Sequence, residues 1–372
     1  MEQKANDTLR KIARDFGAAS LTAAAARGSE LIFETAQGMR DPQLGLPATT
    51  DTVYRLASVT KPISAMALMT LVDEGKADLD TDIGDYLGYK VRNPRWPDVP
   101  LTLRQLMTHT SSLVERGSYN KILAGELPAY KLSEVLISGS PGDCPENWLP
   151  DKPGTRHDYS SFGSGVMGTV AECITGISFS QLVHQRIFEP LGLDASLDAE
   201  TLSAGALVAA PTSAGGIEDT VWLAKSLENK KKLMALPIGE AYRTAQGNGY
   251  MCARDLLTAT RVLTNNGVSR GVRILSQAAV GEMEKVQFDD GKIVSGLNLY
   301  FHDHITGKRL IGHYGRAYGA LAILMFDPGE GTAAAVLCNG AVMSPDGRGV
   351  VGNTMFCTLA MQALWDACFN QS

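Results

Sequence analysis

Strand-like segments lie only near the two ends of this 372-residue chain, and that separation limits the folds it can adopt. Two apolar runs around the turn Arg27-Gly28-Ser29 predict an antiparallel hairpin over residues 18–38. Near the other end, apolar runs predict strands at 308–314, 319–326 and 332–338. Between about 102 and 240 no segment has a clear strand pattern. The two ends must therefore build a sheet together, with a mostly helical insert between them.

Helices are expected both in the insert and around the sheet. The first residues, MEQKANDTLRKIARDFG, form a charged amphipathic helix pattern, and further helices are predicted at 131–139, 163–176, 178–190, 253–265 and 351–369. We therefore expect an α+β protein with an antiparallel sheet flanked by helices. Residues 1–80 together with 240–372 are expected to form this sheet-bearing part, and 81–239 a mostly helical subdomain. The two should act as a single unit, with the functional site in the groove between them.

The composition excludes several classes of protein. Hydrophobic residues make up 44% of the chain and charged residues 20%, as in ordinary globular proteins, and the formal net charge is −6. The one dense basic run, Lys230-Lys231-Lys232, predicts a solvated surface loop, because a nucleic-acid site needs a basic face. No apolar run reaches the length of a signal peptide or a membrane span. We expect a cytoplasmic protein that binds neither nucleic acid nor membranes.

The cysteine spacing and the absence of metal-binding motifs argue against a metal site or a disulfide scaffold. The six cysteines are Cys144, Cys173, Cys252, Cys338, Cys357 and Cys368. They include no C-x-x-C pair, which argues against both a zinc site and a disulfide scaffold and predicts reduced, mostly buried thiols. H-E-x-x-H and the phosphate-binding P-loop are absent. No metal or organic cofactor is expected.

Ser58 lies where a serine nucleophile would be expected. The segment VYRLASVTKP leads into ISAMALMTLVDEG, in which apolar residues recur at helical spacing, so Ser58 is expected at a strand-to-helix junction. Ser58-Val-Thr-Lys61 is an S-x-x-K sequence, and residues i and i+3 share a helix face, which brings the lysine amine beside the serine hydroxyl. A serine at a helix start is also close to free backbone N–H groups that stabilise an oxyanion.

Two other patterns are interpreted as structural or accidental. Ser118-Tyr-Asn-Lys121 repeats the S-x-x-K spacing, but no amphipathic helix follows it. Gly163-Ser-Gly165-Val-Met-Gly168 fits the dinucleotide fingerprint, but no apolar strand precedes it. We expect these glycines to allow close helix packing next to Tyr159. No G-x-S-x-G elbow occurs, which argues against an α/β-hydrolase triad.

Six stretches, taken in order, are similar to the β-lactamase-like serine hydrolases, a group that includes class C β-lactamases, penicillin-binding-protein-type esterases and D-peptidases. They are VYRLASVTKPISAMALMTLVDEGKADLD around Ser58, LTLRQLMTHTSSL at 101–113, PGTRHDYSSFGSGVMG at 153–168, IFEPLGL at 187–193, GNGYMCARDL at 247–256 and GHYGRAYGALAILMFDP at 312–328. The resemblance spans nearly the whole chain. It implies the fold of β-lactamases and penicillin-binding proteins.

The resemblance also implies roles for three side chains. It makes Ser58 the acylated nucleophile, Lys61 its neighbouring base or proton relay, and Tyr159 the tyrosine that exchanges protons with the nucleophile and the leaving group. A buried lysine loses part of its affinity for protons, and nearby cations make a tyrosine more acidic, so either group could take the serine proton. Which of the two is the base stays open at this point.

A third motif, His313-Tyr314-Gly315, is expected to line the site. By resemblance the backbone N–H of Arg316 joins that of Ser58 in an oxyanion hole. Tyr314 is expected to contact the substrate, as is Ser161. His109, by contrast, is interpreted as a structural hydrogen-bonding residue.

Two positions depart from the penicillin-recognising members. His313 stands where many of them have a lysine, and Ser161 stands where they have the asparagine of a Tyr-x-Asn motif. A lysine would attract a substrate carboxylate and an asparagine would bind a substrate amide, so their loss favours an ester. Arg156, His157 or Arg316 could supply a replacement charge.

We therefore expect a carboxylesterase or acyl transferase that acts on small to medium esters through an acyl-enzyme on Ser58. The first alternative is an amide hydrolase with the same machinery, such as a D-amino-acid peptidase, an amidase or a weak β-lactamase. The second, from a different class, is a non-catalytic ligand-binding module with a penicillin-recognising fold. The expected partner is a small-molecule ester or amide, and the oligomeric state is open.

Overall fold

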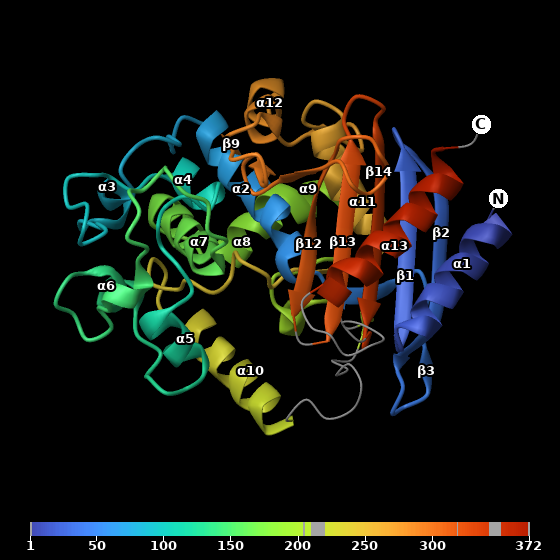
Figure 1. Cartoon of the computed structure of the whole chain (residues 1–372), viewed down its shortest axis with the longest axis horizontal. Coiled ribbons are helices and arrows are strands. Elements are labelled where there is room, and N and C mark those ends of the chain that lie inside the picture. Colours follow the sequence, from blue (N-terminus) through green and yellow to red (C-terminus); the bar gives the residue numbers. More distant parts are fainter. Residues whose placement is uncertain (1, 204, 210–219, 318, 342–350, 371–372) are drawn as a thin grey trace.

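An antiparallel sheet of nine strands, in the order β3-β2-β1-β14-β13-β12-β11-β10-β9, is the centre of the fold (Figure 1). The computed structural model describes residues 2–203, 205–209, 220–317, 319–341 and 351–370. The strands of this sheet are β1 (Ser20–Arg27), β2 (Glu30–Asp41), β3 (Leu46–Pro47), β9 (Phe288–Asp289), β10 (Val294–Ser295), β11 (Tyr300–His302), β12 (Leu310–Ala317), β13 (Ala320–Asp327) and β14 (Thr332–Asn339).

The two ends of the chain meet in the middle of this sheet. β1 pairs with β14 in continuous register from Ser20 opposite Asn339 to Arg27 opposite Thr332. The predicted hairpin is β1–β2, and the three predicted C-terminal strands are β12, β13 and β14. The expected α+β class with an antiparallel sheet is therefore confirmed.

Alternate residues of the central strands face two separate cores, as the strand period of two requires. In β13, Leu321, Ile323 and Met325 contribute to a core with α1 (Glu2–Asp15) and α13 (Val351–Cys368). Ala322 and Leu324 contribute to the larger core on the other face. Figure 1 shows α1 and α13 lying together on one face of the sheet, with α2 (Thr60–Asp73) on the other.

The remaining elements lie mostly between the two halves of the sheet in the sequence. They are η1 (Ala57–Val59), α3 (Ile83–Leu87), α4 (Leu103–Met107), α5 (Gly117–Leu123), α6 (Leu132–Leu136), η2 (Pro145–Asn147), α7 (Ser161–Thr175), α8 (Phe179–Val183), η3 (His184–Phe188), α9 (Glu189–Leu191), η4 (Ala199–Thr201), α10 (Thr220–Met234), α11 (Ala253–Thr264) and α12 (Gln277–Glu284), with the short strands β4 (Thr52–Arg55), β5 (Leu207–Val208), β6 (Tyr250–Met251), β7 (Val268–Ser269) and β8 (Val272–Arg273). The division into 1–80 with 240–372 and 81–239 stays a prediction.

Three details of the insert differ from expectation. The helix predicted over 178–190 is broken into α8, the π-helical turn η3 and α9. Pro190 has no N–H for the carbonyl four residues earlier, which explains why the regular helix fails there. The insert also contains one strand, β5, which pairs in parallel with β4. The lysine run 230–232 lies in α10 rather than in a loop, and Lys230 is only 7% exposed, so the expectation of a solvated loop is wrong for this residue.

The glycines of α7 confirm the expectation of close packing. A Cβ atom at Gly165 would lie 1.9 Å from the carbonyl oxygen of Tyr242, and one at Gly168 would lie 2.7 Å from the Cβ of Ala245. Helix α7 therefore packs closely against the segment 241–246. That segment continues to the site described below.

Two further expectations can be compared with the structure. Cys252, Cys338, Cys357 and Cys368 are buried, and Cys144 and Cys173 are partly buried, so the prediction of mostly buried free thiols is confirmed. In the described ranges no single helix is long and apolar enough to cross a membrane. One bent pair, Ser161–Thr175 with Phe179–Phe188, meets the length and composition criteria only when its two helices are taken together.

Candidate active site

Ser58 lies in a tight turn between β4 and α2. The turn is η1, and the helix proper begins at Thr60, so Ser58 precedes α2 instead of opening it. Ala57 has a φ of 48°, a left-handed conformation that non-glycine residues rarely adopt. Gly249 holds the junction with two hydrogen bonds: its carbonyl accepts from the Leu56 N–H, and its N–H donates to the Thr60 hydroxyl.

Strand β12 passes against this turn, and only a glycine fits at the contact. A Cβ atom at Gly315 would lie 2.2 Å from the carbonyl oxygen of Leu56 and 3.2 Å from the backbone nitrogen of Val59. Beyond Gly312, β12 has no strand partner on its β11 side within the described residues, since β11 pairs only with Leu310–Gly312. The free edge of β12 therefore lies beside Ser58, where a substrate carbonyl can be received.

Lys61 brings its amine to the Ser58 hydroxyl from the same side of the turn. Its Nζ lies 3.1 Å from Ser58 Oγ and donates a 2.7 Å hydrogen bond to the backbone carbonyl of Gln246. The side chain is fully buried. Burial lowers the pKa of Lys61 to about 7; the negative charge of Glu115 opposes this shift and the positive charge of Arg243 adds to it. Near neutral pH, a large fraction of the amine is thus uncharged.

Tyr159 contacts the same serine oxygen. Its hydroxyl donates a 2.7 Å hydrogen bond to Ser58 Oγ, and its ring lies 4.8 Å from the Lys61 amine, centroid to nitrogen. One side of the residue is open, with 38% of its surface exposed. Desolvation of the phenol raises its pKa above the ordinary value of 10, although hydrogen bonds with Ser58 and Ser161 act in the opposite direction. Tyr159 is therefore protonated at neutral pH.

Glu115 is a site residue that the sequence analysis did not identify. Its carboxylate accepts a hydrogen bond from the backbone N–H of Ser161, and its charge acts on both Lys61 and Tyr159. It follows the stretch LTLRQLMTHTSSL by two residues, and this proximity was the available signal. The predicted Ser161 is thus brought next to an acidic group at the entrance of the site.

His313 faces the catalytic side of β12 as a neutral ring. Burial lowers its pKa to about 3, and the nearby Lys61 charge lowers it further. Its Nδ1 lies 2.6 Å from the Tyr314 carbonyl and so carries the proton, while the buried Nε2 has no hydrogen-bond partner in the described structure. The ring therefore offers a buried acceptor near Tyr159, 6.1 Å away between ring centroids.

Tyr314 does not belong to this site, which corrects its expected contact with the substrate. Its hydroxyl lies 3.2 Å from the Thr358 hydroxyl, and its ring packs in the core below α13. Strand alternation explains the result, because His313 and Gly315 face the serine turn and their neighbours point to the opposite face. The Arg316 side chain starts on that opposite face as well, so only its backbone is left for the predicted oxyanion hole.

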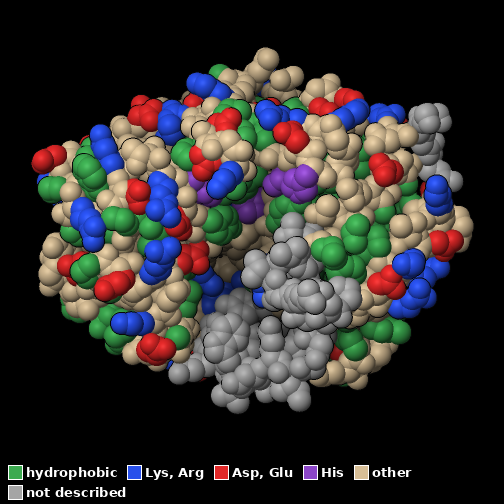
Figure 2. All heavy atoms as spheres, in the orientation of Figure 1, with side chains coloured by type: hydrophobic (Ala, Val, Ile, Leu, Met, Phe, Trp, Pro, Cys, Tyr) green, Lys and Arg blue, Asp and Glu red, His purple; other side chains and the backbone are tan. Residues whose placement is uncertain are grey.

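Aromatic rings from separate segments line the groove above Tyr159. His109 accepts a 3.2 Å hydrogen bond from the Ser160 N–H, as its predicted structural role requires, and its ring contacts that of Tyr159 at 4.5 Å between centroids, tilted by 37°. The His157 Nε2 lies 3.0 Å from the hydroxyl of Tyr300, a second residue missed by the sequence analysis. Figure 2 shows histidine side chains gathered along one edge of a hollow in this face.

Two of the replacement charges considered from the sequence, Arg156 and His157, can be compared with the structure. The guanidinium of Arg156 is exposed and pairs with Asp151 at 3.2 Å. Burial lowers the pKa of His157, which therefore stays uncharged. Across the described ranges, no group of three His, Cys, Asp or Glu side chains is arranged to hold a metal ion.

The geometry agrees with comparisons to known proteins. The family description Beta-lactamase matches residues 6–350. The chain is 28% identical over 324 residues to "Penicillin-binding protein 4" of Amycolatopsis lactamdurans, covering 84% of this chain and 78% of that protein. It is 33% identical over 180 residues to "Esterase EstB" of Burkholderia gladioli, covering 45% of this chain and 44% of the esterase.

Solved structures give the same fold. The octameric penicillin-binding protein homologue from Pyrococcus abyssi superposes with a TM-score of 0.75 and 23% identity, covering 98% of this chain and 76% of that one. The D-amino acid amidase from Ochrobactrum anthropi SV3, complexed with D-phenylalanine, superposes with a TM-score of 0.70 and 21% identity, covering 97% and 99%.

A serine turn with a buried lysine and a tyrosine, on an antiparallel sheet of this order, is the arrangement expected in a family of serine hydrolases. The chain belongs to the β-lactamase family.

Proposed function

We propose that this protein is a carboxylesterase that hydrolyses small to medium esters through an acyl-enzyme on Ser58. The observation that carries the proposal is the double contact on one oxygen: Ser58 Oγ lies 3.1 Å from the Lys61 amine and 2.7 Å from the Tyr159 hydroxyl. A serine becomes a nucleophile only when a nearby group accepts its proton, and these two groups are placed to do so.

Lys61 is the better candidate for the base in the free enzyme. Its pKa of about 7 leaves a neutral amine with a lone pair at working pH, whereas Tyr159 has a raised pKa and keeps its proton. In the proposed first step the Ser58 proton moves to the Lys61 amine as the serine oxygen bonds to the ester carbonyl carbon. Tyr159 then donates its proton to the leaving alcohol as the C–O bond breaks, and it recovers a proton from Lys61.

We place the developing oxyanion between the backbone N–H groups of Ser58 and Arg316. Ser58 is in the short 3₁₀ turn η1 that leads into α2, where backbone N–H groups lack acceptors within the helix. Arg316 is on the β12 segment that has no β11 partner. Donors of this kind typically contribute 10²–10³-fold in rate. The amino-acid side chain at 316 is unimportant in this proposal.

The surroundings of the serine favour an ester over a carboxylate-bearing peptide or a β-lactam. His313 carries no charge at neutral pH, so it cannot attract a substrate carboxylate as a lysine would. Ser161 has no side-chain amide. One of the relatives described above is named an esterase, and its similarity covers 45% of this chain.

A second candidate function rests on Glu115. A carboxylate close to Lys61 and Tyr159 would attract a substrate with a positively charged amino group, for example the amide or ester of an amino acid. The neighbouring fold named a D-amino acid amidase is consistent with such a substrate. Ser58 is the nucleophile in both hypotheses. They differ in the leaving group, which is an amine in the amidase and an alcohol in the esterase.

The test is hydrolysis of p-nitrophenyl acetate and butyrate, followed with intact-mass detection of the acyl-enzyme, by the wild type and by Ser58→Ala. Ester turnover that disappears in Ser58→Ala, together with slow or no reaction with D- and L-phenylalanine amides, supports the carboxylesterase. Faster turnover of one phenylalanine amide than of the esters would favour the second candidate. Ester hydrolysis that is unchanged in Ser58→Ala would exclude the mechanism.

A further inference from the structure

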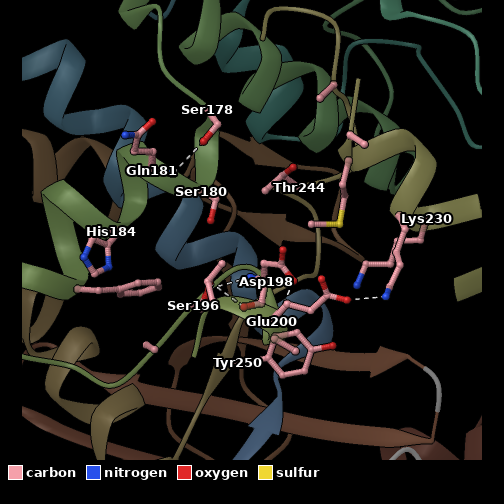
Figure 3. A pocket seen from close by; sticks show the side chains of 18 of the residues that line it. Ser178, Ser180, Gln181, His184, Ser196, Asp198, Glu200, Lys230, Thr244 and Tyr250 are labelled. Carbon is pink, nitrogen blue, oxygen red and sulfur yellow. Dashed lines mark hydrogen bonds and ion pairs between the residues drawn. The ribbon is translucent and has the colours of Figure 1, made fainter. Parts of the chain in front are cut away.

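A cavity of about 880 Å³ lies beside the candidate active site and is separate from it. Its walls come from α8, from η3, from the segment 193–201, from α10 and from Tyr250 on β6 (Figure 3). Its described lining includes neither Ser58 nor Lys61, Tyr159 or His313. The proposed hydrolysis therefore leaves this cavity without a role.

Lys230 on α10 is the unusual residue of the cavity. It is only 7% exposed, and in the described chain its amine has no hydrogen-bond or ion-pair partner. The two lysines that follow it are exposed and paired, Lys231 with Glu200 at 2.5 Å and Lys232 with Glu228 at 2.8 Å. In Figure 3 Lys230 lies across the cavity from Ser178 and His184. A buried amine without a partner costs stability, and such a cost is commonly offset by a ligand or a function.

The charges around Lys230 are predominantly positive. Burial lowers its pKa to about 6, and Arg55 and Arg243 lower it further, with a smaller effect from Lys231. Asp198 is the one acidic group that opposes this shift, and its carboxylate already accepts a hydrogen bond from the Glu200 N–H. Without an anion beside it the amine is therefore largely uncharged at neutral pH, and a bound anion would favour its protonated form.

The other charged groups that face the cavity are engaged elsewhere. Glu200 is paired with Lys231, and Glu172 accepts hydrogen bonds from the backbone N–H groups of Phe179 and Gly239. Asp194 accepts from the Ser203 hydroxyl. The remaining titratable groups of the lining are Tyr250 and His184, the latter on the wall opposite α10. Each of these three carboxylates thus has another partner, and no acidic side chain of the described residues forms an ion pair with Lys230.

Much of the cavity wall is apolar. Phe188, Leu193, Met234, Leu236 and Ile238 contribute to it, together with alanine side chains. Hydroxyl groups are present at Ser180, Ser196 and Thr244. A ligand that satisfies Lys230 and also covers these apolar side chains must carry one anionic group on an apolar body.

We propose that this cavity binds a monocarboxylate with an apolar chain, whose carboxylate pairs with Lys230 and whose chain lies along Phe188, Leu193 and Leu236. The proposed binding does not depend on the proposed esterase activity. The ligand is nevertheless of the same chemical class as one product of ester hydrolysis, a carboxylic acid. The segment 243–250 separates the two sites. Gln246 in this segment holds the Lys61 amine, and Asn248 contacts Met234 of the cavity wall at 3.2 Å.

Octanoate is the probe, and its binding is measured by isothermal titration calorimetry at pH 7 with the full chain. We expect Lys230→Met to weaken binding at least tenfold and the matched control Lys232→Met to leave it unchanged. Because Lys230 must gain a proton to pair with the anion, titrations in buffers of different ionisation enthalpy should report net proton uptake. The wild-type affinity should also fall as pH rises from 6 to 8, a result that needs no variant.

Three outcomes would overturn the proposal. They are unchanged octanoate affinity in Lys230→Met, octanoate binding that is abolished when Ser58 is first blocked with a serine-directed phosphonate, and equally tight binding of 1-octanol or of inorganic phosphate. The first would exclude Lys230, the second would place the ligand in the catalytic groove, and the third would exclude an apolar carboxylate as the preferred ligand. Since octanoate binding is measured without substrate, failure of the esterase proposal does not affect it.

Discussion

The backbone carbonyl of Gln246 accepts a 2.7 Å hydrogen bond from the amine of Lys61, which at the same time lies 3.1 Å from Ser58 Oγ. A main-chain oxygen holds the lysine whatever side chain stands at position 246. The amine keeps its position in both protonation states, since a neutral amine still has two N–H groups to donate. The Lys61 amine can therefore be uncharged in its buried position and still stay beside Ser58.

Replacing Lys61, the proposed base, should strongly reduce activity and preserve the fold. We expect Lys61→Met to lower kcat/KM for p-nitrophenyl acetate by about 10²–10⁴-fold, the usual contribution of a positioned general base. Lys61 is fully buried, so a methionine of similar length should keep or raise the melting temperature. Activity is measured by p-nitrophenol release and stability by thermal unfolding, with Lys232→Met as an exposed-lysine control. Near-wild-type turnover in Lys61→Met would exclude this lysine as the base.

The ester rate should follow the titration of Lys61. The neutral amine is the active form, so kcat/KM should rise with pH and level off above a midpoint near the Lys61 pKa of about 7. Tyr159 has a raised pKa and should not produce a fall at mildly alkaline pH. A pH–rate profile between 5 and 9 tests this expectation. A rate that is flat over that range would assign the base elsewhere.

The lowered pKa of Lys61 should also make the free energy of unfolding depend on pH. Lys61 has a pKa of about 7 in the folded protein and about 10.5 as the model value for an unperturbed lysine. Between these values the unfolded chain binds more protons, so this residue makes the free energy of unfolding rise with pH, by at most about 1.4 kcal/mol per unit. Chemical denaturation at several pH values should show a smaller rise in Lys61→Met than in the wild type. Parallel curves would contradict the lowered pKa.

Replacing Glu115 should shift the pKa of Lys61 and therefore the midpoint of the pH–rate profile. Its negative charge raises the pKa of Lys61, so Glu115→Gln should shift the pH–rate midpoint to lower pH and leave the plateau rate for an uncharged ester largely intact. The exposed Glu126→Gln provides a control that removes an equal charge at a distance. A midpoint that moves equally in both variants would show a general charge effect and not a local one.

The contact between β12 and the serine turn should be intolerant of one methyl group. In Gly315→Ala the new Cβ would meet the Leu56 carbonyl at 2.2 Å, so β12 or the turn must shift. We expect destabilisation of about 1–3 kcal/mol and a loss of kcat/KM larger than stability alone explains. Gly281→Ala in α12 is the matched control: its Cβ meets nothing within 4 Å, and alanine should stabilise the helix by about 0.5–1 kcal/mol. Full activity in Gly315→Ala would show that the turn adapts.

The parts of this protein that follow from local pattern were predictable from the sequence. The periods of the apolar residues predicted the hairpin, β12–β14 and most helices. The S-x-x-K spacing indicated Ser58 and Lys61, and Tyr159 was identified from the resemblance to β-lactamase-like hydrolases. The structure brings these three side chains to one oxygen. Their catalytic roles stay predictions, as does the ester specificity.

What the sequence did not reveal depends on contacts between distant segments. The Gln246 carbonyl that holds Lys61 has no side-chain signature, and Glu115 lies outside the recognised motif. Lys230 looked like part of an exposed basic run, because only the packing of α10 against residues far along the chain buries it. Tyr314 was misassigned for a local reason: it alternates with His313 and Gly315 and so faces α13.

The pairing of β1 with β14 also dictates when the serine turn can be built during translation. β14 lies between β1 and β13, and β12 reaches Gly315 and the turn only as part of that sheet. A ribosome therefore releases Ser58 and Lys61 long before the strands that hold them in place exist. A nascent chain truncated between residues 176 and 239 would carry Ser58, Lys61 and Tyr159 but would lack strand β12, and it should be unreactive toward serine-directed phosphonates.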